Sequence, residues 1–354
     1  MLGMRRAIVM LTIAGQDVTS LFQPRLIELK ISLTEGGESD TLTVTLDDRN
    51  GSIQLPKIGS EVTCLLSWMN GGGSVQFTGR TDEPTSTGSR DGGMLMKITA
   101  RSADMGGEPK AKDTKHKDKG KFKEVAEEFG KKAGLQVKVA DKLGSIERDY
   151  WSMKNESFLQ WGQRHAEELG ATFKVMGKKA VFVEKNGKES ASGKPLGQVM
   201  AAYGDNLIEW SITPKQMRPQ WEEMIVRYFD PQKVEWKEEK KKIEGGGGGG
   251  FKPKAKHIET KRAANKEQAK QKAESNAAES EDGKGAGSIT IVGDGNAQPQ
   301  ARCMIQGVRA GINGNYKITS CTHTYSRNEG WITECELSNP QGEAGSDSRQ
   351  ASNK

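Results

Sequence analysis

Three pairs of adjacent acidic residues are, by type, the best candidates in this chain for general acid–base chemistry. They are Asp47-Asp48, Asp82-Glu83 and Glu167-Glu168. An acid and a base must both reach the same reacting group. Neighbours on a strand point to opposite faces, and neighbours on a helix diverge around its axis. No pair therefore forms an acid–base couple by itself, and we interpret all three as cap or solubility residues.

Two histidines lie within segments of regular pattern. His165 has Trp161 and Leu169 four residues to either side, which places it beside the apolar stripe of a predicted helix and indicates a packed or partly exposed side chain. His323 lies in a predicted strand. The sequence contains no G-x-S-x-G nucleophile motif, so neither histidine has a catalytic triad to join.

The four cysteines, at positions 64, 303, 321 and 335, show no paired short spacing. Without a C-x-x-C knuckle, the histidines at 116, 165, 257 and 323 complete no zinc site. Cys321 and Cys335 are candidates to face each other across adjacent strands, where we favour buried thiols over a disulfide. The six glycines at 245–250 lack the Lys-Ser/Thr ending of a phosphate loop and are interpreted as a flexible link. We predict no catalytic, cofactor-binding or metal-binding residue, no cofactor, and no enzymatic activity.

Lysine is concentrated in two stretches of this basic chain. The formal net charge is +6, and the lysines gather in 110–123 and 237–272. Phe122 and Phe251 are the aromatic residues within those stretches, too few for a stacking platform for nucleic acid. We favour solvated or subunit-facing charge, with DNA binding left as the alternative.

The elements that carry these residues begin with an all-β unit, 1–106. Alternation is clearest in Thr41–Leu46, where Leu42, Val44 and Leu46 share one face and three threonines share the other. Short strands are predicted at about 6–14, 25–34, 41–47, 60–68, 74–83 and 94–102, separated by Gly, Asp and Pro signals. This spacing favours an antiparallel barrel or sandwich.

A small α+β insert is predicted at 107–186. It starts with a polar loop through Lys119, followed by a helix from Phe122 and a strand at 135–139. Asn155-Glu156-Ser157 opens a second helix that ends at Gly170, and a hairpin follows at 172–184.

A second β unit is predicted from two separated pieces, 187–235 and 285–340. Its strands are expected at 207–212, 223–229, 287–293, 301–307, 315–325 and 331–338. Between the pieces, 236–284 is interpreted as a Gly/Lys-rich linker and an Ala-rich helix at 261–280, which either packs through alanines on the barrel or is a solvated connector. The tail, 341–354, is predicted to be disordered.

The one apolar run near the start, Ala7–Ile13, is too short to span a bilayer, and we read it as a first strand. We expect synthesis in the cytoplasm and no membrane insertion by this chain.

Four fragments, in order, resemble the late-control D family, the baseplate hub proteins of contractile phage tails. They are SDTLTVTLDD with the following Pro-Gly turn and strand, GRTDE at 79–83, ITARSADM at 98–105, and the closing strands GNYKI, THTYS and WITECEL. The insert also resembles the family, through NESFL at 155–159.

The resemblance implies two barrel domains per chain, each like a tail-tube subunit. Three chains would close a ring with six barrel positions around a channel, which adapts a threefold spike to a sixfold tube. It also implies a place in the virion baseplate, with the spike, tail tube and baseplate wedge proteins as partners, the tape-measure protein as a further candidate, and no small-molecule substrate.

Two other functions stay open from the sequence. One is the hub of a related contractile machine, such as a tailocin, an extracellular injection system or a type VI spike base. The other is a baseplate cell-wall hydrolase, which would need a buried carboxylate or a metal set that the sequence does not show.

Overall fold

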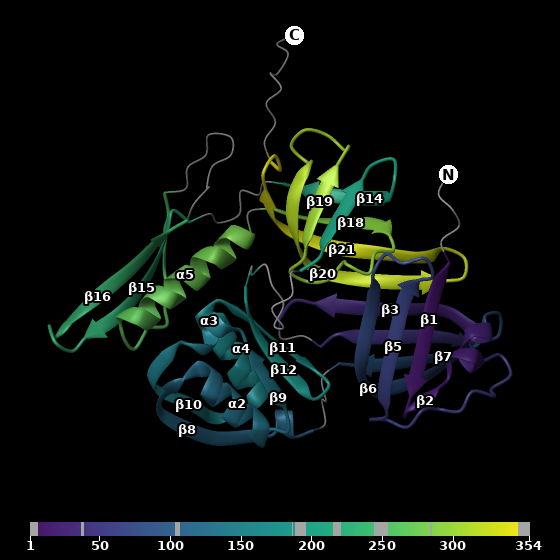
Figure 1. Cartoon of the computed structure of the whole chain (residues 1–354), viewed down its shortest axis with the longest axis horizontal. Coiled ribbons are helices and arrows are strands. Elements are labelled where there is room, and N and C mark those ends of the chain that lie inside the picture. Colours follow the sequence, from purple (N-terminus) through teal and green to yellow (C-terminus); the bar gives the residue numbers. More distant parts are fainter. Residues whose placement is uncertain are drawn as a thin grey trace, which may run out of the picture.

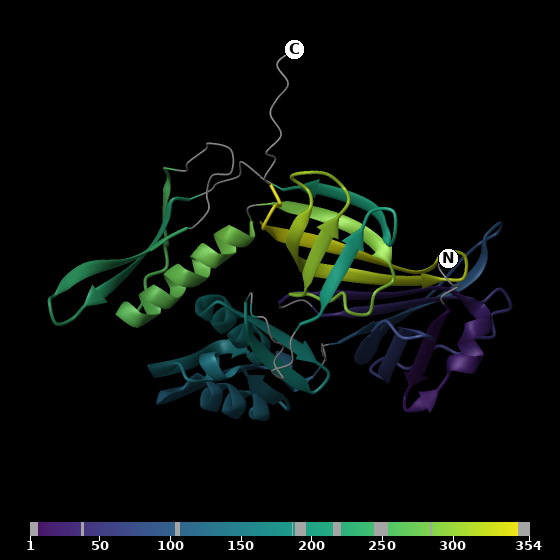
Figure 2. The same ribbon diagram turned by 45° about the horizontal axis from the view of Figure 1, so that its top comes forward.

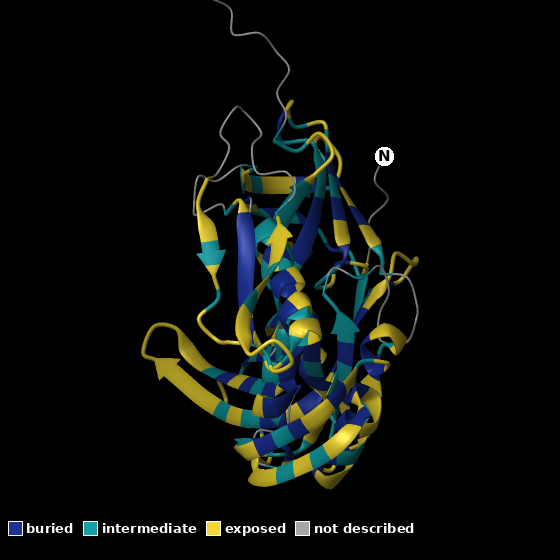
Figure 3. Ribbon diagram, turned by 90° about the vertical axis from the view of Figure 1, so that its left-hand side faces the viewer, coloured by how far each residue is buried: buried dark blue, intermediate teal, exposed yellow. Residues whose placement is uncertain are grey.

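The computed structural model describes residues 6–36, 39–102, 107–185, 187, 196–214, 221–243, 254–283 and 285–345. The described chain is mainly β, as predicted, and has four parts (Figure 1): two barrel-like units side by side, a compact α+β insert, and an arm formed by a small sheet and a helix. Buried and exposed residues alternate along many of the strands, as period-two patterning requires (Figure 3).

The first barrel has a fully antiparallel sheet with the strand order β3-β4-β7-β6-β5-β1. Its strands are β1 (Ala7–Ile13), β3 (Leu26–Thr34), β4 (Thr41–Asp47), β5 (Glu61–Trp68), β6 (Ser74–Ser89) and β7 (Gly93–Arg101). Between β1 and β3 lie β2 (Gln16–Asp17), α1 (Thr19–Phe22) and η1 (Gln23–Arg25). Leu42, Val44 and Leu46 are buried, so the predicted strands and their inward faces are confirmed.

The second barrel repeats most of this order as β14-β18-β21-β20-β19-β13. Its strands are β13 (Gln198–Ala202), β14 (Leu207–Thr213), β18 (Ala286–Val292), β19 (Arg302–Gln306), β20 (Gly314–Ser326) and β21 (Gly330–Gln341). One pair differs from the antiparallel expectation, because β13 runs parallel to β19. The four strands predicted after residue 285 are confirmed, whereas β13 carries too short a pattern to have been predicted.

The two barrels share one continuous sheet. The second half of β20 pairs with β3, from Ser320 opposite Thr34 to Ser326 opposite Glu28. Leu33 packs against the cores of both barrels at this seam. The long strands β20 and β21 run from the second barrel toward the first (Figure 2).

The insert surrounds an aromatic core that contains Phe122, Trp151, Trp161 and Phe182. Its elements are η2 (Glu108–Lys110), β8 (Lys112–Lys121), α2 (Phe122–Lys132), β9 (Gln136–Val139), α3 (Asp141–Gly144), β10 (Glu147–Ser157), α4 (Phe158–Leu169), β11 (Ala171–Met176) and β12 (Lys179–Glu184). The predicted second helix is confirmed: Ser157 caps it in a capping box with Gln160, and Gly170 ends it at φ +64°.

The predicted polar loop through Lys119 is wrong, because most of it forms strand β8. This strand pairs along its length with β10, which sequence patterning also missed. The apolar side chains under the pair come from β10, including Trp151, whose Nε1–H donates to the Gly120 carbonyl at 2.8 Å. A strand held by backbone hydrogen bonds over such a partner needs no apolar alternation of its own.

The third correction concerns the predicted linker and the strand before it. β15 (Glu223–Asp230), β16 (Glu235–Lys242) and β17 (Lys256–Ile258) form a separate sheet, so β15 does not belong to the second barrel and β16 is not linker. Helix α5 (Lys266–Asp282) packs through Ala269 and Ala273 on Val226 and Tyr228 of this sheet, not on a barrel. Together they form the arm at the left of Figure 1. The glycines at 245–250 and Phe251 lie outside the described residues, as do residues 346–354 of the predicted tail.

Candidate assembly surfaces

A buried ionic cluster joins all four parts of the molecule. Lys317 Nζ, on β20, lies 2.9 Å from Glu35 Oε2 beyond the end of β3 and 3.1 Å from Asp282 Oδ2 on α5. Thr172 of the insert lies 3.2 Å from Glu35, and Gln300 donates to Thr172 at 2.7 Å. We call these residues, with Asn339 on Asp282, the Lys317 node.

A second contact fixes the insert on the first barrel. Lys174 Nζ, on β11, lies 2.6 Å from Asp40 Oδ1 and donates to the Thr34 carbonyl at 2.6 Å. Asp40 also accepts from the Thr34 backbone N–H at 3.1 Å. Buried ion pairs are costly to break but impose a defined geometry. The two contacts therefore join the barrels, the insert and the arm through specific buried pairs.

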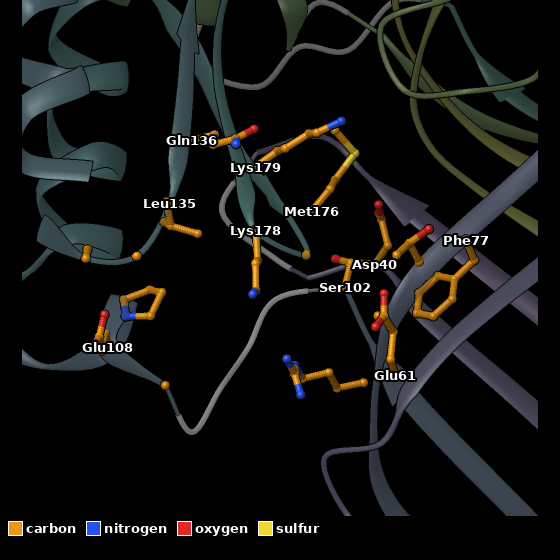
Figure 4. A pocket seen from close by; sticks show the side chains of 18 of the residues that line it. Asp40, Glu61, Phe77, Ser102, Glu108, Leu135, Gln136, Met176, Lys178 and Lys179 are labelled. Carbon is orange, nitrogen blue, oxygen red and sulfur yellow. The ribbon is translucent and has the colours of Figure 1, made fainter. Parts of the chain in front are cut away.

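A cleft of about 850 Å³ separates the first barrel from the insert (Figure 4). Glu61, Phe77 and Arg80 line it from the barrel, and Leu135 and Lys178 line it from the insert. Its charges have both signs and do not converge on one point, which suits a protein contact better than a small-molecule site.

Several apolar side chains on and near β13 and β14 of the second barrel are exposed. Met200 on β13, Tyr203 beyond it and Ile208 on β14 are all exposed, and the ring centroid of Tyr203 lies 5.4 Å from that of Trp210. The Tyr203–Trp210 pair with its exposed tyrosine is a candidate for protein contact.

The arm carries an exposed aromatic pair. The ring centroids of Phe229 and Trp236 lie 5.4 Å apart on its open face, and the Arg262 guanidinium lies 4.5 Å from the Trp236 ring centroid. The sequence signal for this surface was the Trp-Lys-Glu start of the tract that we assigned to a linker.

The three acidic pairs lie apart and have structural partners. Asp47 binds Arg49 and Asp48 accepts backbone N–H groups of the following turn, while Asp82 binds Arg101. Glu168 lies 3.0 Å from Arg148 and 3.2 Å from His165 Nδ1. Burial raises the pKa of Glu168, but the His165 and Arg148 partners outweigh it and lower the pKa to about 2.

His165 and His323 are both buried. His165 packs against Trp161 with ring centroids 4.7 Å apart, and burial lowers its pKa. His323 lies between Thr333 Oγ1 and the Ala297 carbonyl, each at 3.0 Å. Burial lowers the pKa of His323 to about 4. The carbonyl can only accept, so Nε2 carries the proton and Nδ1 accepts from the threonine hydroxyl, and this bonding fixes the ring within the barrel.

All four cysteines are free and buried. Cys321 and Cys335 are directly opposite on β20 and β21, as the sequence suggested, and both remain thiols. Burial raises the pKa of Cys64, Cys303 and Cys321 to about 12, so these thiols are inert.

Within the residues that the structure describes, no three His, Cys, Asp or Glu side chains gather as a metal site requires. No described helix combines the length and the apolar character needed to cross a membrane. Lysines of both basic stretches pair with carboxylates: Lys117 lies 2.7 Å from Glu128, and Lys240 lies 3.3 Å from Glu238.

Two phage proteins are similar to this chain in sequence. Each is named "Probable baseplate hub protein": that of Escherichia phage 186 is 32% identical over 196 residues, and that of Escherichia phage P2 is 26% identical over 198 residues. Each alignment covers 55% of this chain, and the chain spans about half (50%) of each relative. These relatives confirm the resemblance to hub proteins. No protein-family model matches the chain.

Solved structures with low sequence identity share the fold. A tail protein from Neisseria meningitidis MC58 matches with a TM-score of 0.67 at 14% identity, over 94% of this chain and 96% of that one. The prophage MuSo2 tail protein from Shewanella oneidensis matches with 0.65 at 12%, over 94% and 98%. A component of the E. coli type VI secretion system matches with 0.56 at 8%, over 95% and 78%. The chain therefore has the β-rich fold of phage tail proteins.

Proposed function

We propose that this protein is a structural hub of a contractile phage tail baseplate. The observation that carries the proposal is the pair of barrels with repeated strand order that share one continuous sheet. A chain that presents two similar units can match a threefold partner through whole chains and a sixfold partner through single barrels. The two hub-named relatives support the same function.

On this proposal the working form is a homotrimeric ring in the virion baseplate. The spike would bind one side of the ring, and the tail tube would bind the other. The wedge proteins would bind its periphery, where the arm and its Phe229–Trp236 pair offer a surface. The function is structural, carried by surfaces instead of a catalytic cleft.

A second candidate is the hub of a related contractile machine. The likeness to the E. coli type VI component over 95% of this chain favours it, because that protein shares the fold. The two candidate functions differ in the contractile machine to which the hub belongs. Both require the homotrimeric ring proposed above.

Multi-angle light scattering at several concentrations, with and without a co-expressed spike protein, tests the proposal. A species of three times 38.6 kDa, alone or with spike, is the expected result. A chain that stays monomeric under every condition, spike included, contradicts the hub function.

A further inference from the structure

The repeat between the barrels extends to single residues in the hairpins β6–β7 and β20–β21. Ser89 opposes Gly93 across a five-residue turn, and Ser326 opposes Gly330 across another. Both glycines have positive φ, +72° and +74°. In each turn the serine Oγ accepts a backbone N–H from three residues on, at 2.8 and 3.1 Å. Ser89 and Ser326 therefore hold equivalent positions.

Strands β3 and β14 are equivalent in the same way. Each begins with Leu-Ile-Glu, at 26–28 and 207–209. In each, the register against the next strand shifts between the leucine and the glutamate, which is a β-bulge at the isoleucine. A bulge at the same place in the same tripeptide fixes the alignment of the two strands residue by residue.

One edge of β3 is paired with β20 of the same chain, whereas the equivalent edge of β14 is unpaired among the described residues. β3 lies between β4 and the second half of β20. β14 pairs with β18, and across the described residues no strand lies along its other edge from Glu209 to Thr213. The second half of β6, Thr85–Ser89, pairs with β7 and is otherwise exposed. Unpaired edges of this kind are templates for another strand.

The inward-facing side chains of β3 are more deeply buried than those at the equivalent positions of β14. Leu29 and Ile31 of β3, next to the seam with β20, are 0% exposed. Trp210 and Ile212, at the equivalent positions of β14, pack on the core of the second barrel but are only half-buried. A strand placed on β14, as β20 is placed on β3, would cover them.

We propose that β14 of one copy of this chain pairs antiparallel with Thr85–Ser89 of β6 in a second copy, and so repeats between chains the β20–β3 seam within the chain. Transfer of that register places Thr87 opposite Ser211 and Gly88 opposite Trp210. Gly88 stands where Tyr325 faces Leu29 in the internal seam, and its lack of a side chain leaves room for the larger tryptophan ring.

This contact joins different surfaces of the two copies, so it is heterologous and generates a closed ring when the rotation between copies closes. The inference deepens the proposed hub function and rests on its ring. It assigns the strands that close the ring and predicts that the intermolecular and internal seams are alike.

Disulfide trapping tests the register. Residues directly opposite on antiparallel strands have Cα atoms about 4.5–5.5 Å apart, which suits a disulfide. We expect the double variant Thr87→Cys/Ser211→Cys, oxidised with copper–phenanthroline, to form covalent oligomers up to a trimer on non-reducing gels. The native cysteines are buried and do not compete.

The matched control is Thr85→Cys/Ser211→Cys, which is displaced by two residues and should cross-link at least about tenfold less. Each single variant should give at most dimers. A trimer by light scattering in which Thr87→Cys/Ser211→Cys does not cross-link overturns the seam and leaves the hub function standing. Absence of a trimer with and without spike overturns both, and equal cross-linking of the two double variants overturns the register. Thermal melting of the reduced variants confirms that each one folds.

Discussion

Trp331 of the second barrel lies inside the first barrel, with its ring centroid 5.1 Å from that of Trp68. The Trp68 Nε1–H donates to the Gly293 carbonyl at 2.7 Å, so backbone and ring contacts both cross the boundary. A Cβ on Gly293 would lie 2.3 Å from the Trp331 ring, which explains the glycine at that position. The barrels therefore share a core as well as a sheet, and should unfold together.

Replacement of Trp331 by alanine should destabilise both barrels. Loss of a buried tryptophan side chain costs about 3–5 kcal/mol. We expect one cooperative transition in urea, with its midpoint at a lower urea concentration and the free energy of unfolding reduced by this amount. Trp331→Phe is the control: it keeps an aromatic ring in the core, and the Trp331 Nε1–H that it removes has no hydrogen-bond partner among the described residues, so it should cost clearly less than Trp331→Ala. Two separate transitions in the parent protein would contradict the shared core.

Removal of the Lys317 ammonium group should lower the free energy of unfolding more than removal of an ammonium group at the surface. Lys317→Met leaves Glu35 and Asp282 buried without it, and loss of one partner of a buried pair costs about 3–5 kcal/mol. Lys142→Met, which removes an exposed partner of Glu184, should cost less than about 1 kcal/mol. Chemical denaturation measures both, and similar losses would show that the node adds no stability.

Acid should destabilise the protein through His323. Its pKa is about 4 in the folded protein, against about 6.5 for an unperturbed histidine. The unfolded chain therefore binds the proton first, and stability falls as the pH drops from about 6.5 to 4. The shift corresponds to about 3 kcal/mol.

The variant His323→Asn should flatten the dependence of the free energy of unfolding on pH in this window. His116→Asn is the control, because His116 is exposed on β8. An unchanged slope in the His323 variant would assign the acid sensitivity to other groups.

The native thiols should resist modification. All four cysteines are buried, and burial raises the pKa of each thiol. We expect less than one thiol per chain to react with Ellman's reagent at pH 8, and four to react in guanidinium without a reductant. A total of two in denaturant would show that Cys321 and Cys335 form a disulfide in solution.

The sequence alone predicted the strands of the first barrel, the last four strands and the main helices of the insert. In each of these, apolar residues recur with the period of the element, as in Leu42, Val44 and Leu46 or along α4. The strand patterns also carried the resemblance to hub proteins. The repeated Leu-Ile-Glu tripeptide at 26–28 and 207–209 was not recognised from the sequence. Local periodicity is visible in a sequence because each element buries its own face.

Tertiary structure alone decided the remaining features. Strands β8 and β16 have almost no apolar residues, and their positions depend on backbone hydrogen bonds to β10 and β15. The transfer of β15 to the arm, the Lys317 node and the β20–β3 seam depend on pairings between distant segments. Backbone groups are the same in every residue, so side-chain patterns do not report which distant strand they bind. The choice among partners is made only when the whole chain packs.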